Sequence, residues 1–204
     1  VLQIMHTGRI GHPNNLPSGA RVIGPSAIAQ RGETSTYDFE KQPYPIPEEM
    51  TTMEVQSAVN EFAKCAKLAI QSGFDGIEIH GAHGYLPNQF LNQSSNRRTD
   101  RYGGSRDNRM RFLLEVIEAS IQAIGPGKVA VRISPFSYAD TEEDPKELIA
   151  ELAIAIKATG VYWNRCYEPW RINRDKFIKA DLIEKGISVE SHNGSLLWEP
   201  WEIS

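Results

Sequence analysis

The chain has 204 residues, of which 40% are hydrophobic and 24% are charged, so it can bury a sizeable core. Its formal net charge of −4 argues against nucleic acid as the main partner, because phosphate binding needs a basic face. No apolar run approaches the roughly 18 residues of a membrane span, and no signal peptide is expected. Cys65 and Cys166 form no disulfide framework, so the cytosol is the expected compartment.

The first part of the chain predicts two strands, separated by a long connection and a helix. Residues 1–5 are expected to form a buried strand, and residues 6–49 form a connection rich in proline. A connection of this length is usually functional, and in a barrel it would cover the face that carries the site. Thr51 and Glu54 then form a capping box before a periodic helix that Gly73 ends. Residues 74–80 are the next predicted strand.

The second part repeats the alternation of helix and strand. We expect a helix over residues 105–124, a strand over 128–134, and a helix that begins at Asp144-Pro145 and stops at Gly160. A strand over 161–167, a weak helix over 173–185 and a short strand over 187–190 complete the pattern. Alternation of this kind indicates βαβ units and an α/β fold with a parallel sheet.

Two histidines and a tyrosine, His80, His83 and Tyr85, follow the strand over residues 74–80 within six residues. They indicate a site, because ligands of parallel α/β folds bind at the carboxyl ends of the strands. The pair His80-x-x-His83 could instead be half of a metal site. Such sites usually need a third ligand, and Glu78 has the right strand parity but lies deeper, so no metal is expected.

The same stretch carries a family resemblance. The motif HGAHGYLxxQFL, followed by NxRTDxYGGSxxNR (residues 80–109), resembles the old yellow enzyme family of FMN-dependent ene-reductases. The resemblance extends upstream to LQIMHTGRIGHP (residues 2–13) and downstream to VAVRISPF (residues 129–136). It implies a (β/α)8 TIM barrel, of which about four βα units are visible. It also implies FMN as cofactor, NAD(P)H as reductant and an activated alkene, an α,β-unsaturated carbonyl or nitro compound, as substrate.

The resemblance assigns a role to each candidate residue at the substrate. His80 and His83 would donate hydrogen bonds to the carbonyl or nitro oxygen, where negative charge develops. Tyr85 would donate the proton, since a phenol keeps its proton at pH 7. The alternative for Tyr85 is a loop anchor. Met5 stands where many relatives have a tryptophan in the substrate pocket, which implies a differently shaped pocket.

The resemblance also places two residues at the flavin. Gln3, an amide among apolar neighbours, would hydrogen-bond the ring, and its alternative is an amide paired to backbone in the core. Arg132 would lie against the electron-rich edge of the flavin, and its alternative is a buried ion pair with Glu78. His6 and His12 are interpreted as loop histidines with satisfied partners rather than as substrate contacts.

The polar loop after the motif is interpreted as structure rather than chemistry, with a network formed by Asn96, Arg98, Asp100, Asn108 and Arg109. Residues 170–204 show no glycine-rich phosphate pattern. We therefore expect a partial FMN-oxidoreductase barrel over residues 1–169 and a divergent tail over 170–204. The rival interpretation is a truncated, non-catalytic remnant that acts by oligomerisation or partner binding, and a metal-dependent hydrolase is the third. A homo-oligomer is a further expectation, because an incomplete barrel leaves strand edges unpaired.

Overall fold

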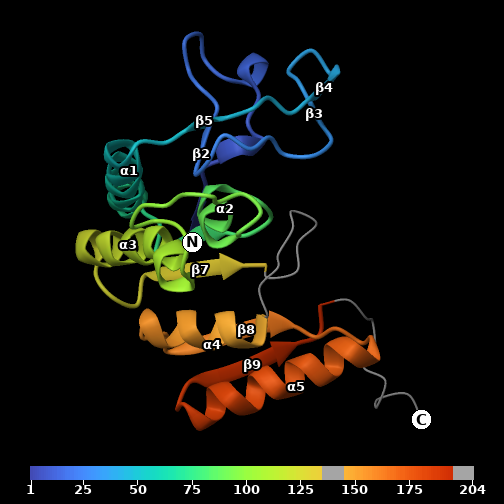
Figure 1. Ribbon diagram of the computed structural model, residues 1–204. Helices are drawn as coiled ribbons and strands as arrows, with labels where there is room; N and C mark the ends of the chain where they lie inside the picture. Colours follow the sequence, from blue (N-terminus) through green and yellow to red (C-terminus); the bar gives the residue numbers. More distant parts are fainter. Residues whose placement is uncertain (135–144, 195–204) are drawn as a thin grey trace. The chain divides into compact units, whose positions relative to one another are not determined.

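The computed structural model describes residues 1–134 and 145–194 (Figure 1). Contacts divide the chain into two compact units, Val1–Glu143 and Asp144–Ser204. Each unit combines parallel strands with helices, so the predicted α/β class is confirmed. None of the helices in the described ranges is both long enough and apolar enough to cross a membrane.

The first unit is built on a parallel sheet with the strand order β1-β6-β7. Its strands are β1 (Leu2–Ile4), β6 (Ile77–Gly81) and β7 (Val129–Ile133). Its helices are α1 (Thr52–Gln71), the short α2 (Leu86–Leu91) and α3 (Arg106–Ile124). The predicted strands and the two long helices are thus confirmed, with ends shifted by up to three residues.

The sheet has a covered face and an open face. Ile77 and Ile79 of β6 are almost fully buried, and α1 and α3, which contact β1 and β7, pack against each other. Phe62 of α1 and Phe112 of α3 meet edge to face at 6.4 Å between ring centroids. Residues of the opposite strand parity are more exposed along β7, where Arg132 is an example. Gln3, Glu78 and His80 share this second strand parity with Arg132 in the register of the sheet.

Both long helices begin and end as their sequences predict. The Thr51 side chain accepts a hydrogen bond from Glu54 N, and the Glu54 carboxylate accepts one from Thr51 N. After α1 the chain turns at Gly73, whose φ of 91° belongs to the left-handed region. Ser105 caps α3, and Gly125 ends it with a φ of 89°.

The long connection over residues 6–49 contains short regular elements that the sequence did not reveal. Two 3-10 helices, η1 (Gly8–Ile10) and η2 (Pro13–Asn15), come first. β2 (Ile23–Gly24) and β5 (Glu48–Glu49) then pair in parallel, and β3 (Glu33–Ser35) and β4 (Lys41–Pro43) form an antiparallel hairpin. Strands of two or three residues are too short to produce a period, which explains why they were missed.

The second unit contains α4 (Pro145–Ala155), β8 (Gly160–Asn164), α5 (Pro169–Glu184) and β9 (Ser188–His192). β8 and β9 pair in parallel, so β8, α5 and β9 form one βαβ unit. Among the described residues of this unit, one cluster of buried apolar side chains contains Ala150, Ala153, Ile178, Leu182 and Ile187. The predicted boundary at residue 169 coincides with the first residue of α5, inside this unit, and the division stays a prediction.

Two expectations for the second unit need correction. The helix after Pro145 ends at Ala155 rather than at Gly160, because Lys157 adopts a φ of 53° and turns the chain there. Ala158 N then donates to Ala153 O at 2.8 Å. The predicted helix over residues 173–185 begins earlier, with Pro169 in its first turn, where proline is tolerated.

Candidate active site

A tight turn after β6 gathers the three candidate side chains of the motif. His83 and Gly84 have successive positive φ values of 54° and 79°, which reverse the chain between β6 and α2. The turn brings the Tyr85 ring to 4.7 Å from the His80 ring, edge to face. The His80 and His83 rings lie 5.4 Å apart. The structure therefore places His80, His83 and Tyr85 in one cluster at the carboxyl end of β6.

His80 is the buried member of this cluster. It is 5% exposed, and its Nδ1 atom has no hydrogen-bond partner among the described residues. Burial lowers the pKa of His80 below its ordinary 6.5, and the nearby His83 and Arg132 lower it further, while Glu78 opposes them. At neutral pH the ring is therefore uncharged and carries one N–H donor and one acceptor.

The register of the sheet puts Gln3 and Arg132 on the same face as His80. Gln3 pairs with Glu78, and Arg132 pairs with His80, in neighbouring parallel strands. Glu78 and His80 are two residues apart in β6 and share a face. The Gln3 amide donates a short hydrogen bond from Nε2 to Glu78 Oε1, which leaves its carbonyl oxygen directed elsewhere.

The contacts of Arg132 and Gln3 can be compared with the alternative roles, an ion pair with Glu78 and an amide paired to backbone. In the described part of the chain, Arg132 makes no ion pair with Glu78, and its side chain is exposed. Gln3 is paired to a side chain and not to backbone. Met5 lies one residue beyond β1, two residues after Gln3, and is 48% exposed.

The two loop histidines have local partners, as predicted. His6 Nδ1 accepts a hydrogen bond from Gly8 N at 3.0 Å, and burial lowers the pKa of His6. His12 Nδ1 accepts one from Asn14 N at 3.2 Å and thereby caps η2. Neither contact involves the cluster around His80.

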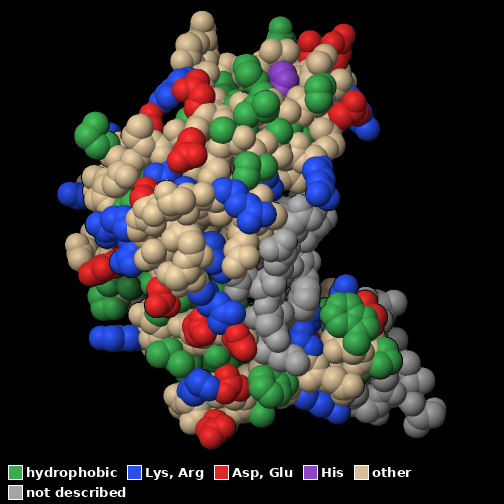
Figure 2. Space-filling view, viewed as in Figure 1, with side chains coloured by type: hydrophobic (Ala, Val, Ile, Leu, Met, Phe, Trp, Pro, Cys, Tyr) green, Lys and Arg blue, Asp and Glu red, His purple; other side chains and the backbone are tan. Residues whose placement is uncertain are grey.

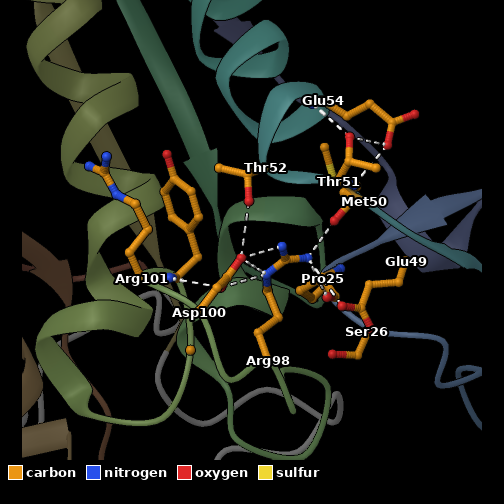
Figure 3. A network of polar contacts seen from close by, with 12 residues as sticks. Pro25, Ser26, Glu49, Met50, Thr51, Thr52, Glu54, Arg98, Asp100 and Arg101 are labelled. Carbon is orange, nitrogen blue, oxygen red and sulfur yellow. Dashed lines mark hydrogen bonds and ion pairs between the residues drawn. The ribbon is translucent and has the colours of Figure 1, made fainter.

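The arginine-rich loop forms a network that holds backbone segments together (Figure 3). The buried Arg98 donates to Pro25 O at 3.0 Å and to Met50 O at 2.5 Å. Its guanidinium also pairs with Asp100 at 2.6 Å. One side chain thus joins the loop to both ends of the segment that contains the β3–β4 hairpin.

Other members of the loop make similar contacts to backbone. Asn96 Nδ2 donates to Phe90 O at 2.7 Å and to Tyr102 O at 2.8 Å. Asn108 Nδ2 donates to Gly103 O at 3.0 Å, and Arg109 Nε donates to Leu91 O at 2.9 Å. These contacts support the structural interpretation of Asn96, Arg98, Asp100, Asn108 and Arg109.

The sequence analysis missed α2 and two of its side chains. Asn88 and Gln89 are buried and hydrogen-bond to the peptide groups of Gly84, within the turn that carries the site. A signal was available, because two adjacent amides inside the apolar run from Leu86 to Leu91 need partners if buried. Like Gln3, Asn88 and Gln89 are amides among apolar neighbours.

Within the described ranges, no group of three or more His, Cys, Asp or Glu side chains is arranged to hold a metal ion. The donors contributed by the sheet and by the turn after β6 are instead an amide, two imidazoles, a phenol and a guanidinium. Such donors suit a planar ligand with polar edges and a polar substrate oxygen.

Parallel strands that alternate with helices, and a cluster at the carboxyl end of β6, are features of (β/α)8-type proteins, and the solved structures described below assign the chain to part of such a barrel. It belongs to the NADH:flavin oxidoreductase / NADH oxidase family, whose model matches residues 1–186. The match extends beyond residue 169, the last residue of the barrel portion expected from the sequence.

Individual relatives agree with this family. The chain is 50% identical over 152 residues to the "Probable flavin mononucleotide-dependent alkene reductase" of Leishmania infantum, covering 72% of this chain and 42% of that protein. It is 47% identical over 135 residues to 12-oxophytodienoate reductase 7 of rice, covering 65% of this chain and 34% of that protein. The chain thus spans less than half the length of these curated relatives.

Solved structures show the same likeness in three dimensions. The old yellow enzyme homologue of Zymomonas mobilis superposes with a TM-score of 0.77 at 28% identity, covering 95% of this chain and 56% of that one. Morphinone reductase superposes with a TM-score of 0.75 at 28% identity, covering 93% of this chain and 60% of that one. The resemblance predicted from the motifs is confirmed.

Proposed function

We propose that this chain carries the flavin and substrate face of an FMN-dependent reductase that reduces activated alkenes with NAD(P)H. The substrate class is an α,β-unsaturated carbonyl or nitro compound. The observation that carries the proposal is His80, a buried neutral imidazole whose Nδ1 has no partner among the described residues. A buried polar atom without a partner is costly, and a bound ligand would satisfy it.

The residues on the open face fit FMN. Gln3 offers a carbonyl oxygen and a second N–H to the polar edge of a planar ring, while its first N–H is held by Glu78. Arg132 offers an exposed cation to an electron-rich edge on the same face. His80 lies between them in the register of the sheet, so these three side chains would hold the cofactor.

The side chains of the turn would act on the substrate. When bound, FMN supplies hydride transfer, which no side chain can perform. His80 and His83 would hold the carbonyl or nitro oxygen with their N–H groups and stabilise the negative charge that develops there. Tyr85, in contact with the His80 ring, would donate its phenolic proton to the α-carbon of the substrate.

The proposal draws support from the relatives. The Leishmania protein is described as an alkene reductase, and morphinone reductase has been solved with tetrahydroNAD. The chain covers 42% of the Leishmania relative.

The expected partners are small molecules. On the face shown in Figure 2, basic and acidic side chains of the described residues are interspersed and do not gather into a basic surface. This supports a role without nucleic acid. β1 and β7 form the edges of the described three-stranded sheet, which supports the expectation of self-association. We propose the cytosol as compartment, on the basis of composition and the free cysteines Cys65 and Cys166.

Flavin binding is the direct test. FMN titrated into the purified chain should quench flavin fluorescence, and the loaded chain should oxidise NADPH when an enone is added. Tyr85→Phe should lower the rate of enone reduction by about 10²–10⁴-fold, the usual contribution of a positioned acid, without changing FMN affinity. Tyr37→Phe, at the exposed tip of the β3–β4 hairpin, is the matched control and should change neither.

The opposite result would favour the rival interpretation. A folded chain that neither quenches FMN fluorescence nor oxidises NADPH would support a non-catalytic remnant that acts through oligomerisation or a partner. Analytical ultracentrifugation of that chain would then report whether it self-associates.

A further inference from the structure

Two adjacent amide side chains of α2, Asn88 and Gln89, both hydrogen-bond to Gly84 in the turn after β6. Gly84 N donates to Asn88 Oδ1 at 2.8 Å, and Gly84 O accepts from Gln89 Nε2 at 2.6 Å. Both amides are buried, Asn88 at 5% exposure and Gln89 at 1%. The polar groups of the Gly84 residue, its N–H and its C=O, are thus both held by side chains.

Gly84, the residue that these amides hold, lies in a turn whose backbone conformation is unfavourable without support from neighbouring structure. His83 has a φ of 54°, a strained conformation that non-glycine residues keep only when neighbouring structure imposes it. Gly84 continues the left-handed turn with a φ of 79°. Ser134 Oγ accepts from His83 N at 2.7 Å, so His83 is fixed from one side and Gly84 from the other.

Gln89 also hydrogen-bonds to the loop after β1. The same Nε2 atom that donates to Gly84 O also donates to Thr7 O at 2.9 Å, and Oε1 accepts from Arg9 N at 3.1 Å. These partners are 80 and 82 residues away in sequence. One buried amide therefore sets the position of the loop after β1 relative to the turn after β6.

We infer that Asn88 and Gln89 are positioning residues for the proposed reaction. They touch neither substrate nor cofactor in this assignment, but they fix Gly84, which lies between His83 and Tyr85. The backbone conformation of Gly84 determines how the rings of His80, His83 and Tyr85 are arranged. The inference rests on the proposed function for its catalytic meaning, and on hydrogen bonds of the chain itself for its structural content.

Matched substitutions can test the hydrogen bonds of Asn88 and of Gln89 separately. Asn88→Asp keeps an oxygen that accepts from Gly84 N, whereas Asn88→Leu keeps the size and removes the acceptor. Gln89→Glu keeps the acceptor for Arg9 N and removes both N–H donors, so the carbonyls of Thr7 and Gly84 would face a carboxylate. Circular dichroism of each variant first establishes that it is folded.

The first measurement needs no cofactor. Amide hydrogen exchange at Gly84, followed by NMR, should accelerate about tenfold or more in Asn88→Leu, because the buried Gly84 N–H would lose its acceptor and be left without a partner. Asn88→Asp should stay within about threefold of the unsubstituted chain, since it keeps the same hydrogen bond. Ala66, in the buried face of α1, is the reference amide and should not change.

The second measurement reports the site directly. The nuclear Overhauser effect between the ring protons of His80 and Tyr85 should weaken in Gln89→Glu and in Asn88→Leu, and persist in Asn88→Asp. Equal acceleration of exchange at Gly84 and Ala66 would overturn the inference, because it would show general destabilisation. An unchanged ring contact in both Gln89→Glu and Asn88→Leu would overturn it as well.

A third measurement connects the turn to ligand binding. In the FMN-loaded chain, Asn88→Leu should weaken the binding of a phenol about tenfold while FMN affinity stays within about twofold, a split that general unfolding would not give. A chain that binds no FMN would contradict the proposed function. The exchange and ring measurements on that chain would still decide whether Asn88 and Gln89 position the turn.

Discussion

His80 and Arg132 occupy paired positions of β6 and β7, so the buried imidazole and the exposed guanidinium leave the sheet on the same face. Burial is the main reason that the pKa of His80 is lowered, and the nearby His83 and Arg132 lower it further. The pair therefore favours a neutral imidazole, which can donate to a substrate oxygen without placing a permanent charge in the site.

The contribution of Arg132 can be measured. Arg132→Met should raise the pKa of His80 toward 6.5, because removing a nearby cation makes the imidazolium less costly. Glu78→Gln should lower it further, because Glu78 acts in the opposite direction. NMR titration of the imidazole protons reads both shifts. Lys128→Met, an exposed lysine just before β7, is the control and should leave the titration unchanged.

The same shift has a consequence for folding. A histidine whose pKa is lowered on folding binds fewer protons in the native state than in the unfolded state below its ordinary 6.5. Its contribution to stability is complete above that pH and decreases as the pH falls toward the folded pKa. Arg132→Met should flatten this part of the pH profile, and a steeper profile would contradict the role given to Arg132.

The two histidines should act together on an oxygen ligand. If FMN binds, His80→Ala and His83→Ala should each weaken the binding of a phenol, which mimics the charged oxygen. Removing one donor from a comparable site costs roughly 2.7–4 kcal/mol, and less is expected here because two donors share the oxygen. His12→Ala, which removes only the cap of η2, is the control. Unchanged phenol titration in the double variant would contradict both roles.

Most of the fold could be predicted because its long elements repeat a period. α1 and α3 are 20 and 19 residues long, carry buried residues at helical spacing and have caps visible in the sequence. α2 could not be found this way, because its six residues are all buried and show no polar face. The end of α4 was misplaced because a lysine, Lys157, adopts the turn conformation that glycine usually provides.

In the site, too, residues close in sequence could be predicted, whereas contacts between residues far apart in sequence could not. His80, His83 and Tyr85 are close in sequence, and strand parity was enough to group Glu78 with His80. The pairing of Gln89 with Thr7 and Arg9 spans about 80 residues and depends on how β1 and β6 are aligned. A single sequence carries no direct record of such a contact, so the role of Gln89 emerged only from the structure.

The Arg98 network should contribute strongly to stability. Arg98→Met removes a side chain that is 5% exposed, leaves the carbonyls of Pro25 and Met50 without their donor, and unpairs Asp100. Breaking a buried ion pair from one side costs roughly 3–5 kcal/mol, and slightly less is expected here because Asp100 is partly exposed. Urea unfolding followed by circular dichroism measures the change.

Arg101 offers the matched control for this prediction. It lies three residues further along the same loop, is 54% exposed and pairs with Glu115 at 2.6 Å. An exposed ion pair contributes about 0–1 kcal/mol, so Arg101→Met should shift the unfolding midpoint far less. Equal midpoints for Arg98→Met and Arg101→Met would show that the buried network does not hold the fold in the way proposed.

A substitution at Gly8 tests sterically whether the hydrogen bonds of Gln89 hold the loop after β1 in place. Gly8 and Gly19 both have positive φ values, 56° and 83°, so alanine at either position carries a backbone cost of roughly 1–2 kcal/mol. Only at Gly8 would the added Cβ meet another side chain, at 2.2 Å from Gln89 Oε1, whereas at Gly19 nothing lies within 4 Å. The comparison therefore separates backbone strain from the clash.

Gln89 cannot move aside cheaply, because it is 1% exposed and held by Thr7, Arg9 and Gly84. Overpacking of a buried site costs roughly 1–3 kcal/mol, so Gly8→Ala should destabilise the chain by about that much more than Gly19→Ala in urea unfolding. Gly8→Ala should also weaken the contact between the His80 and Tyr85 rings, because a displaced Gln89 releases Gly84. If both alanine variants unfold at the same urea concentration with the ring contact intact, Gln89 is free to move and does not tie the two loops together.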